Sequence, residues 1–188
     1  MKKIAVFASG FGSNFEVIAA ATESGQIEAE IALLVTDHAD CYAVERAHNH
    51  HVEVFAFNPK SYPSKADFET EIVTQLRQRD VELIVLAGYM RLIGEVLLNA
   101  YPNKIVNIHP ALLPAFPGKH AIEQAYNYGV KVFGITIHYV DAGMDTGKII
   151  AQSCFTAKGD ETVDEIETKI HALEHTLYPQ VIQQLVIC

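Results

Sequence analysis

The chain has 188 residues, of which 49% are hydrophobic and 20% are charged, proportions that are ordinary for a globular protein with a sizeable core. Its formal net charge of -9 argues against broad binding to nucleic acid, because no basic excess is available to displace counterions from phosphates. Three cysteines without a Cys-x-x-Cys pair, and no apolar run of membrane-spanning length, predict one cytoplasmic domain over residues 1–188 with no structural disulfide, metal or membrane partner.

Apolar runs alternate with helical patterns through the first half of the chain. Strands are predicted over residues 4–8, 30–36, 52–56 and 83–87. Helices are predicted over residues 14–24, 43–49 and 64–79. This alternation indicates an α/β fold with an open, mostly parallel central sheet and helices on both faces. Ligands of such sheets bind beyond the carboxyl ends of the strands, which groups four loops: 9–14, 36–40, 88–93 and 107–120.

The second half of the chain has a different pattern. A short strand at 105–108 is followed by longer strands at 132–140 and 148–155, which predict some antiparallel pairing in the C-terminal part. Residues 162–186 are predicted to form a closing helix that is broken near Pro179, because proline cannot supply a helical N–H group.

The strand at 105–108 leads into a proline-rich loop with two candidate functional residues. Alternation along the strand places Asn107 and His109 on the same face, at its carboxyl end. Three prolines and Gly118 stiffen the following loop and exclude regular structure from it. The pair is interpreted either as a presented amide and imidazole or as a strand end with a capping histidine, and spacing alone leaves both open.

The segment Ser9-Gly-Phe-Gly-Ser-Asn14 lies between the first strand and the first helix. Free N–H groups and the helix dipole at this position favour an anion, and Ser13 and Asn14 add side-chain donors. Phe15 occupies the third glycine position of the dinucleotide-binding fingerprint, so that fingerprint is absent. The segment is interpreted as a phosphate-binding loop, and the alternative is a tight turn with an asparagine cap.

Three other polar segments contain residue types that are common in functional sites. Asp145 lies between two glycines in the segment Asp141 to Gly147, which is either a loop over a cleft or a polar hairpin turn. The tract 48–51, with three histidines, is predicted to be a solvated turn rather than a metal site, because no carboxylate or cysteine stands near it in sequence. Glu174 falls on the closing helix, where a polar residue commonly marks the solvent-facing side.

Taken together, these segments resemble a known family. Asn107-Ile-His-Pro-Ala-Leu-Leu-Pro-x-Phe-Pro-Gly118, preceded by Ala87-Gly-Tyr-Met-Arg91, is similar to the phosphoribosylglycinamide formyltransferases of purine synthesis. The Gly10-x-Gly-Ser-Asn14 loop, the Asp141 to Gly147 segment and Glu174-His175 agree with that family in order and spacing. The resemblance extends over nearly the whole chain and implies a single-domain, Rossmann-like formyltransferase fold.

The resemblance also implies an activity and a set of site residues. The activity would be transfer of a formyl group from 10-formyltetrahydrofolate to the amine of glycinamide ribonucleotide, with no metal and by a monomer or homodimer. Asn107, His109 and Asp145 would be catalytic. Gly12, Ser13, Asn14 and Glu174 would bind the ribonucleotide. The folate pocket would be lined by Lys65, Met90, Arg91, Leu92, Ile93, Asn107, Asp141 and Asp145, with Lys65 standing where some members carry arginine.

Three other enzyme functions and a simple binding function remain open, but particular residues or the composition argue against each of them. In formyltetrahydrofolate deformylase, the nearest alternative, a second histidine usually follows the motif histidine, whereas Pro110 follows it here. Methionyl-tRNA formyltransferase is disfavoured by the acidic composition. A dinucleotide oxidoreductase using Asp37 for a ribose is opposed by Phe15, and a simple nucleotide-binding module would not need Asn107, His109 and Asp145 together.

Overall fold

The apolar runs form the strands of one sheet in the computed structural model, which describes residues 1–188. The strands are β1 (Lys2–Phe7), β2 (Ala29–Thr36), β3 (Val54–Ala56), β4 (Leu83–Leu86), β5 (Ile105–His109), β6 (Val132–Tyr139) and β7 (Ile149–Thr156). They lie in the order β3-β2-β1-β4-β5-β6-β7, parallel from β3 to β5 and antiparallel from β5 to β7. The predicted fold class, including its antiparallel C-terminal part, is confirmed.

Six α-helices connect or cover the strands. They are α1 (Ser13–Glu23), α2 (Tyr42–Asn49), α3 (Lys65–Gln78), α4 (Glu95–Ala100), α5 (Ala121–Tyr128) and α6 (Val163–Ile187), with one 3-10 turn at Pro59–Ser61. The sequence did not predict α4 and α5. Each spans only one to two turns and buries few apolar side chains (Leu97 in α4, Ala121 and Ala125 in α5), so neither has a readable period.

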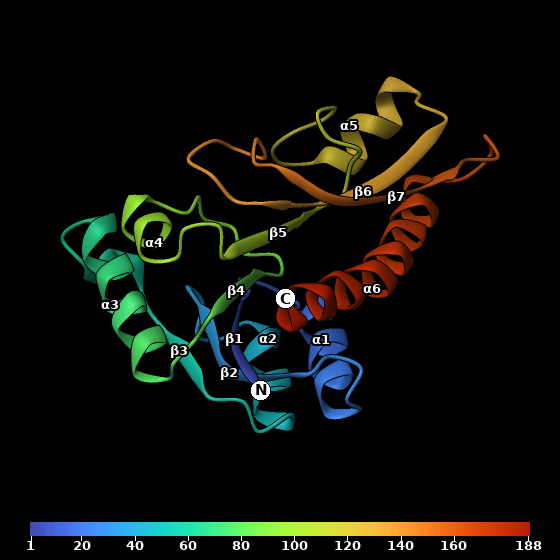
Figure 1. Ribbon diagram of the computed structural model, residues 1–188. Helices are drawn as coiled ribbons and strands as arrows, with labels where there is room; N and C mark the ends of the chain where they lie inside the picture. Colours follow the sequence, from blue (N-terminus) through green and yellow to red (C-terminus); the bar gives the residue numbers. More distant parts are fainter.

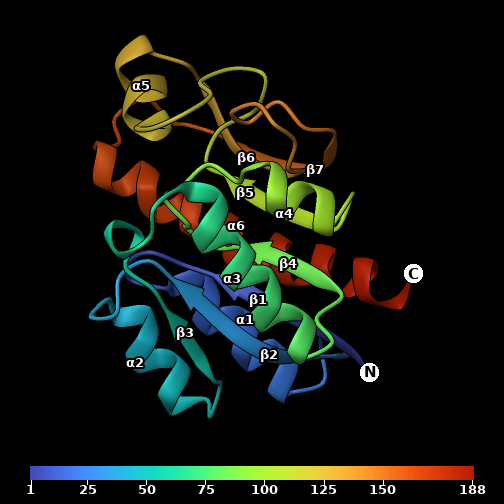
Figure 2. The same cartoon turned by 90° about the vertical axis from the view of Figure 1, so that its left-hand side faces the viewer.

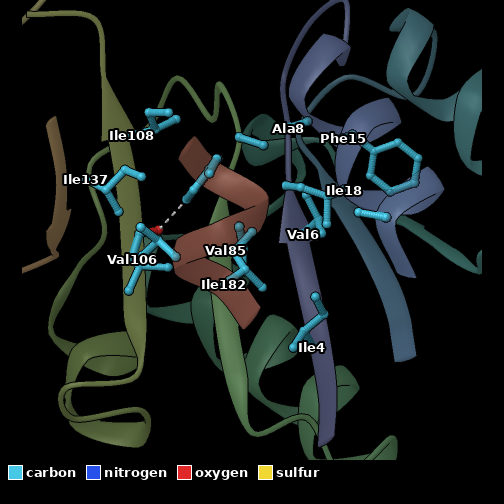
Figure 3. Close-up of a cluster of buried hydrophobic side chains, with 14 of the residues drawn as sticks. Ile4, Val6, Ala8, Phe15, Ile18, Val85, Val106, Ile108, Ile137 and Ile182 are labelled. Carbon is cyan, nitrogen blue, oxygen red and sulfur yellow. Dashed lines mark hydrogen bonds between the residues drawn. The ribbon is translucent and has the colours of Figure 1, made fainter. Parts of the chain in front are cut away.

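The helices pack on both faces of the sheet. Helices α1, α2 and α6 cover one face, and α3 and α4 cover the other (Figures 1 and 2). Because side chains alternate along a strand, each strand contributes to both apolar layers: Val106 of β5 packs on the α1 and α6 side, and Ile105 packs on the α3 side. Figure 3 shows the first layer, where Val6, Val85 and Ile182 meet between the strands and α6.

Helix α6 runs without interruption through Pro179, so the predicted break is wrong. Proline in a helix interior costs about 3 kcal/mol, and the surrounding packing offsets that cost. Tyr178, Val181 and Ile182 are all buried against the sheet. The Tyr178 hydroxyl also donates to the Leu86 carbonyl at 2.7 Å, which joins α6 to the end of β4. None of the helices combines the length and apolar composition that crossing a bilayer requires.

The histidine tract at 48–51 is not the simple solvated turn that was predicted. His48 and His51 are exposed, but the His50 side chain is 14% exposed and lies between two carboxylates of α1. Its Nδ1 is 2.7 Å from Glu23 Oε1, and its Nε2 is 3.1 Å from Glu16 Oε1. Burial opposes protonation of the ring, but the hydrogen bonds and charges of Glu23 and Glu16 outweigh burial and raise the pKa of His50.

The stability of the α1–α2 junction should therefore depend on pH. A group with a raised folded-state pKa contributes stability that is fully present below its unfolded pKa and is lost as pH rises through the folded value. The unfolding free energy of the unmodified chain should therefore fall between about pH 6 and pH 9. In His50→Gln we expect this fall to be smaller by roughly 0.5 kcal/mol. Urea denaturation measures this difference, and His48→Gln is the matched exposed control. Equal pH slopes for the unmodified chain and His50→Gln would contradict the assignment.

Candidate active site

Two antiparallel strands place four polar residues on one face of the sheet. Asn107 of β5 lies opposite His138 of β6, and His109 lies opposite Thr136. Opposed residues of an antiparallel pair project to the same side, and residues two apart on a strand do so as well. All four side chains therefore share one face, which agrees with the predicted common direction of Asn107 and His109.

Asp145 joins this group from the loop between β6 and β7. Its Oδ2 lies 3.4 Å from His109 Nδ1, and its Oδ1 lies 3.6 Å from His138 Nε2. The Gly118 N–H donates to Oδ2 at 2.8 Å, and the carboxylate side chain is 12% exposed. The structure thus brings Asn107, His109 and Asp145 together, with the carboxylate between two imidazoles.

The hydrogen-bond partners fix the ring orientations. The Nε2–H of His109 donates to the Phe116 carbonyl at 2.8 Å, and Asp145 faces its other nitrogen. In His138, Nδ1–H donates to the Tyr139 carbonyl at 2.8 Å, so Nε2 is free to accept from Asn107 Nδ2 at 3.4 Å. His138 therefore orients the amide of Asn107.

Sequence reasoning missed His138 and Thr136. Thr136 is fully buried and holds the proline-rich loop, because its Oγ1 donates to the Ala111 carbonyl at 2.7 Å and accepts from the Leu113 N–H at 3.0 Å. Both residues were read as part of a strand among apolar neighbours. The available signal was their period-two spacing, which matches that of Asn107 and His109 on the adjacent strand.

The loop before α1 has the geometry of an anion-binding turn. Gly12 caps α1 in the left-handed conformation with φ 75°, and a Cβ there would lie 2.8 Å from Ala43 Cβ, so only glycine fits. The Gly10 carbonyl accepts from the Ala43 N–H at 3.1 Å, and the Phe11 carbonyl accepts from Arg46 Nε at 3.0 Å. Both carbonyls are thereby held toward α2, while the first N–H groups of α1 lack helical acceptors.

Glu174 of α6 lies beside this loop. Its Oε2 accepts from Asn14 Nδ2 at 3.2 Å, and the residue is 6% exposed, so it does not lie on a solvent-facing side. Burial raises the pKa of Glu174, and the hydrogen bond from Asn14 offsets only part of that rise. Asn14 Oδ1 is buried and has no partner in the protein. This acceptor is available to a ligand that carries an O–H or N–H group.

The predicted folate residues fall into two groups. Met90 and Leu92 are 66% and 52% exposed, whereas Ile93 is buried in the layer beneath α3 and could face a ligand only through its main chain. Lys65 begins α3, and its Cε lies against Gly94 at the end of the 88–93 loop. Asp141 accepts from the Gly143 N–H and the Thr146 hydroxyl, so its carboxylate shapes the turn that carries Asp145.

No group of three or more His, Cys, Asp or Glu side chains is arranged to hold a metal ion.

Known proteins match the chain over nearly all of its length. A family model described as formyl transferase matches residues 2–182. The chain is 58% identical to phosphoribosylglycinamide formyltransferase of Bacillus subtilis, over 98% of this chain and 95% of that one. It is 35% identical to the trifunctional purine biosynthetic protein adenosine-3 of Drosophila melanogaster, over 98% of this chain but 14% of that longer protein. Glycinamide ribonucleotide transformylase 1 from Geobacillus kaustophilus superposes with a TM-score of 0.96, at 54% identity and 98% coverage of both chains.

Proposed function

The chain belongs to the formyl transferase family, and we propose that Asn107, His109 and Asp145 carry its chemistry. The reaction transfers the formyl group of 10-formyltetrahydrofolate to the amine of glycinamide ribonucleotide, in purine biosynthesis. The observation that carries the residue assignment is the position of the Asp145 carboxylate, 3.4 Å from His109 on the face shared with Asn107.

The three residues suit attack by a neutral amine on the formyl carbon. Negative charge then grows on the formyl oxygen, and the Asn107 amide and a His109 N–H are donors for it. Removal of one such donor typically costs about 10²–10³ in rate. His138 supports this role, because its lone pair keeps the Asn107 N–H groups oriented. No covalent intermediate on the protein is needed.

His109 also supplies the proton transfer that the reaction requires. The attacking nitrogen loses a proton and the departing folate nitrogen gains one, and an imidazole can mediate that exchange near neutral pH. Asp145 stabilises the imidazolium and fixes its orientation. Without substrate, Nε2–H is bonded to the Phe116 carbonyl, so an acceptor on the substrate competes with that carbonyl for the donor.

The ribonucleotide binds at the loop before α1, here called the ribonucleotide loop (residues 9–14). Its phosphate is held by N–H groups of Gly12, Ser13 and Asn14 at the amino end of α1. Glu174 accepts from the ribose or the glycinamide end. The buried, unpaired Asn14 Oδ1 supports a ligand donor at this point.

The folate binds along the segment after β4, here called the folate loop (residues 88–93). Exposed Met90 and Leu92 offer apolar contacts, Arg91 offers charge, and Ile93 contributes its main chain. Asp141 and Asp145 shape the opposite wall, and Lys65 lies against Gly94 at the end of the folate loop. The chain acts as a monomer or homodimer in the cytoplasm, and its net charge of -9 supports the absence of nucleic acid and anionic membrane among its partners.

The decisive test of the reaction is an assay with and without the amine substrate. With 10-formyltetrahydrofolate and glycinamide ribonucleotide together, we expect formation of tetrahydrofolate and formylated ribonucleotide in equal amounts. With 10-formyltetrahydrofolate alone, we expect no consumption above background. Equal consumption in both reactions would identify water as the acceptor and favour the deformylase.

Removal of the central imidazole or carboxylate should abolish most of the turnover. We expect His109→Ala and Asp145→Ala each to lower kcat by about 10²–10⁴ while leaving the dissociation constant of glycinamide ribonucleotide nearly unchanged. Steady-state kinetics and calorimetric titration measure the two quantities. His48→Ala and Asp40→Ala alter exposed residues of the same types and should retain full activity. Near-normal turnover in either test variant would exclude the role given to that residue.

Asn14→Ala should act on binding of the ribonucleotide rather than on chemistry. The change removes a donor to Glu174 and an acceptor available to the substrate, so we expect the KM for glycinamide ribonucleotide to rise about tenfold, with kcat within about threefold of normal. The matched control is Asn99→Ala, an exposed position on α4. An effect confined to the KM for the folate would contradict the assignment of this loop.

A further inference from the structure

We propose that Asp37 is a positioning residue that fixes the ribonucleotide loop and the folate loop relative to each other. The inference rests on the proposed function for the identity of the two ligands. The juxtaposition itself rests on contacts among Asp37, Ser9 and Arg91. Asp37 touches none of the three proposed catalytic residues. From the sequence alone, its only candidate role was that of a ribose ligand in a dinucleotide site, whose fingerprint the chain lacks.

Asp37 stands at the carboxyl end of β2, next to the first loop. Its side chain is 2% exposed, which is rare for a carboxylate. The Ser9 hydroxyl donates to Oδ1 at 2.6 Å, and His38 Nδ1 donates to the same oxygen at 3.0 Å. Ser9 is the first residue of the ribonucleotide loop, so this carboxylate holds the point where that loop leaves β1.

The second oxygen of Asp37 holds the folate loop. Arg91 Nε donates to Oδ2 at 2.7 Å. The two loops are also joined directly, because Ser9 Oγ accepts from the Met90 N–H at 3.0 Å and the Ser9 N–H donates to the Gly88 carbonyl at 3.1 Å. A single buried carboxylate therefore connects the loops that follow β1, β2 and β4.

The charge of Asp37 is what makes the arrangement rigid. Burial alone would raise the pKa of this carboxyl, but the hydrogen bonds from Ser9, His38 and Arg91 outweigh burial and lower it. The group thus stays ionised, and charge-assisted hydrogen bonds are stronger than neutral ones. Arg91 is 38% exposed at its side chain, so its remaining N–H groups stay available beside the exposed Met90.

Comparison of Asp37→Ala with Asp37→Asn tests the proposal. The alanine variant loses both acceptors, and we expect the KM values for glycinamide ribonucleotide and for 10-formyltetrahydrofolate each to rise about tenfold, with kcat within about threefold of normal. Asparagine keeps one acceptor and the shape but loses the charge and sets an N–H group against donors, so it should recover only part of either loss. Asp40→Ala, an exposed aspartate of the same loop, should change neither KM.

Hydrogen exchange provides a readout that needs no substrate. In Asp37→Ala we expect faster exchange in peptides covering residues 9–14 and 88–93. These include the Met90 N–H, which donates a hydrogen bond to the Ser9 hydroxyl. Exchange in β5 and β6 should stay unchanged. Should Asp37→Ala fail to fold, Ser9→Ala removes the two contacts of the Ser9 hydroxyl, leaves the pair of Asp37 with Arg91, and is expected to give the same two-loop pattern in a milder form.

The outcomes separate the two claims. If the unmodified chain binds neither substrate, the proposed function fails, and the exchange pattern still decides whether Asp37 positions both loops. Unchanged KM values together with unchanged exchange in a folded Asp37→Ala variant would overturn the proposal. A fall in kcat alone, or loosening of the whole sheet rather than of the two loops, would overturn it as well, because either result describes a different role.

Discussion

The pairing of β5 with β6 is the constraint on which the candidate site depends. Parallel pairing ends at β5, and the antiparallel partner brings a residue of β6 directly opposite each residue of β5. Asn107 thereby meets His138, and His109 lies beside the loop held by Thr136. A slip of one residue in this register would turn these side chains to the other face of the sheet. The apolar layers on both faces oppose such a slip, because Val106 and Ile105 would have to exchange sides.

The sequence predicted those parts of the fold that leave a local pattern. Buried parallel strands are continuous apolar runs, and the common face of Asn107 and His109 follows from alternation alone. Asp145 is different, since nothing local indicates that a glycine-flanked aspartate of a distant loop approaches His109. Only the resemblance to a family suggested that they converge. The short helices α4 and α5 leave too few buried side chains to be read, and Pro179 misled because its cost is offset by tertiary packing around Tyr178.

The residues whose roles sequence reasoning missed share a physical property. His138, Thr136 and Asp37 are polar but almost fully buried, and each lies in or directly after an apolar strand. Their polar groups are satisfied by partners that are remote along the chain, such as Arg91 for Asp37 and Ala111 for Thr136. A sequence shows the polar residue but not its partner. Burial of such a group without partners would cost free energy, so in hindsight the isolated polar residue in an apolar run predicts a network.

Electrostatics at the site are local, and they oppose the overall charge of the chain. A molecule with a net charge of -9 repels anions at long range, yet the proposed substrates are a phosphate ester and a folate. Two buried carboxylates, Asp37 and Glu174, and the half-buried Asp145 also lie near the site, so the site is not made attractive to anions by a lack of acidic groups. Each carboxylate is instead satisfied differently: Asp37 by Arg91, Asp145 by the Gly118 N–H and the facing Nδ1 of His109, and Glu174 by a raised pKa that favours its neutral form. The N–H groups at the start of α1 are then the local source of positive potential for a phosphate, and their orientation depends on the carbonyls of Gly10 and Phe11 being held toward α2.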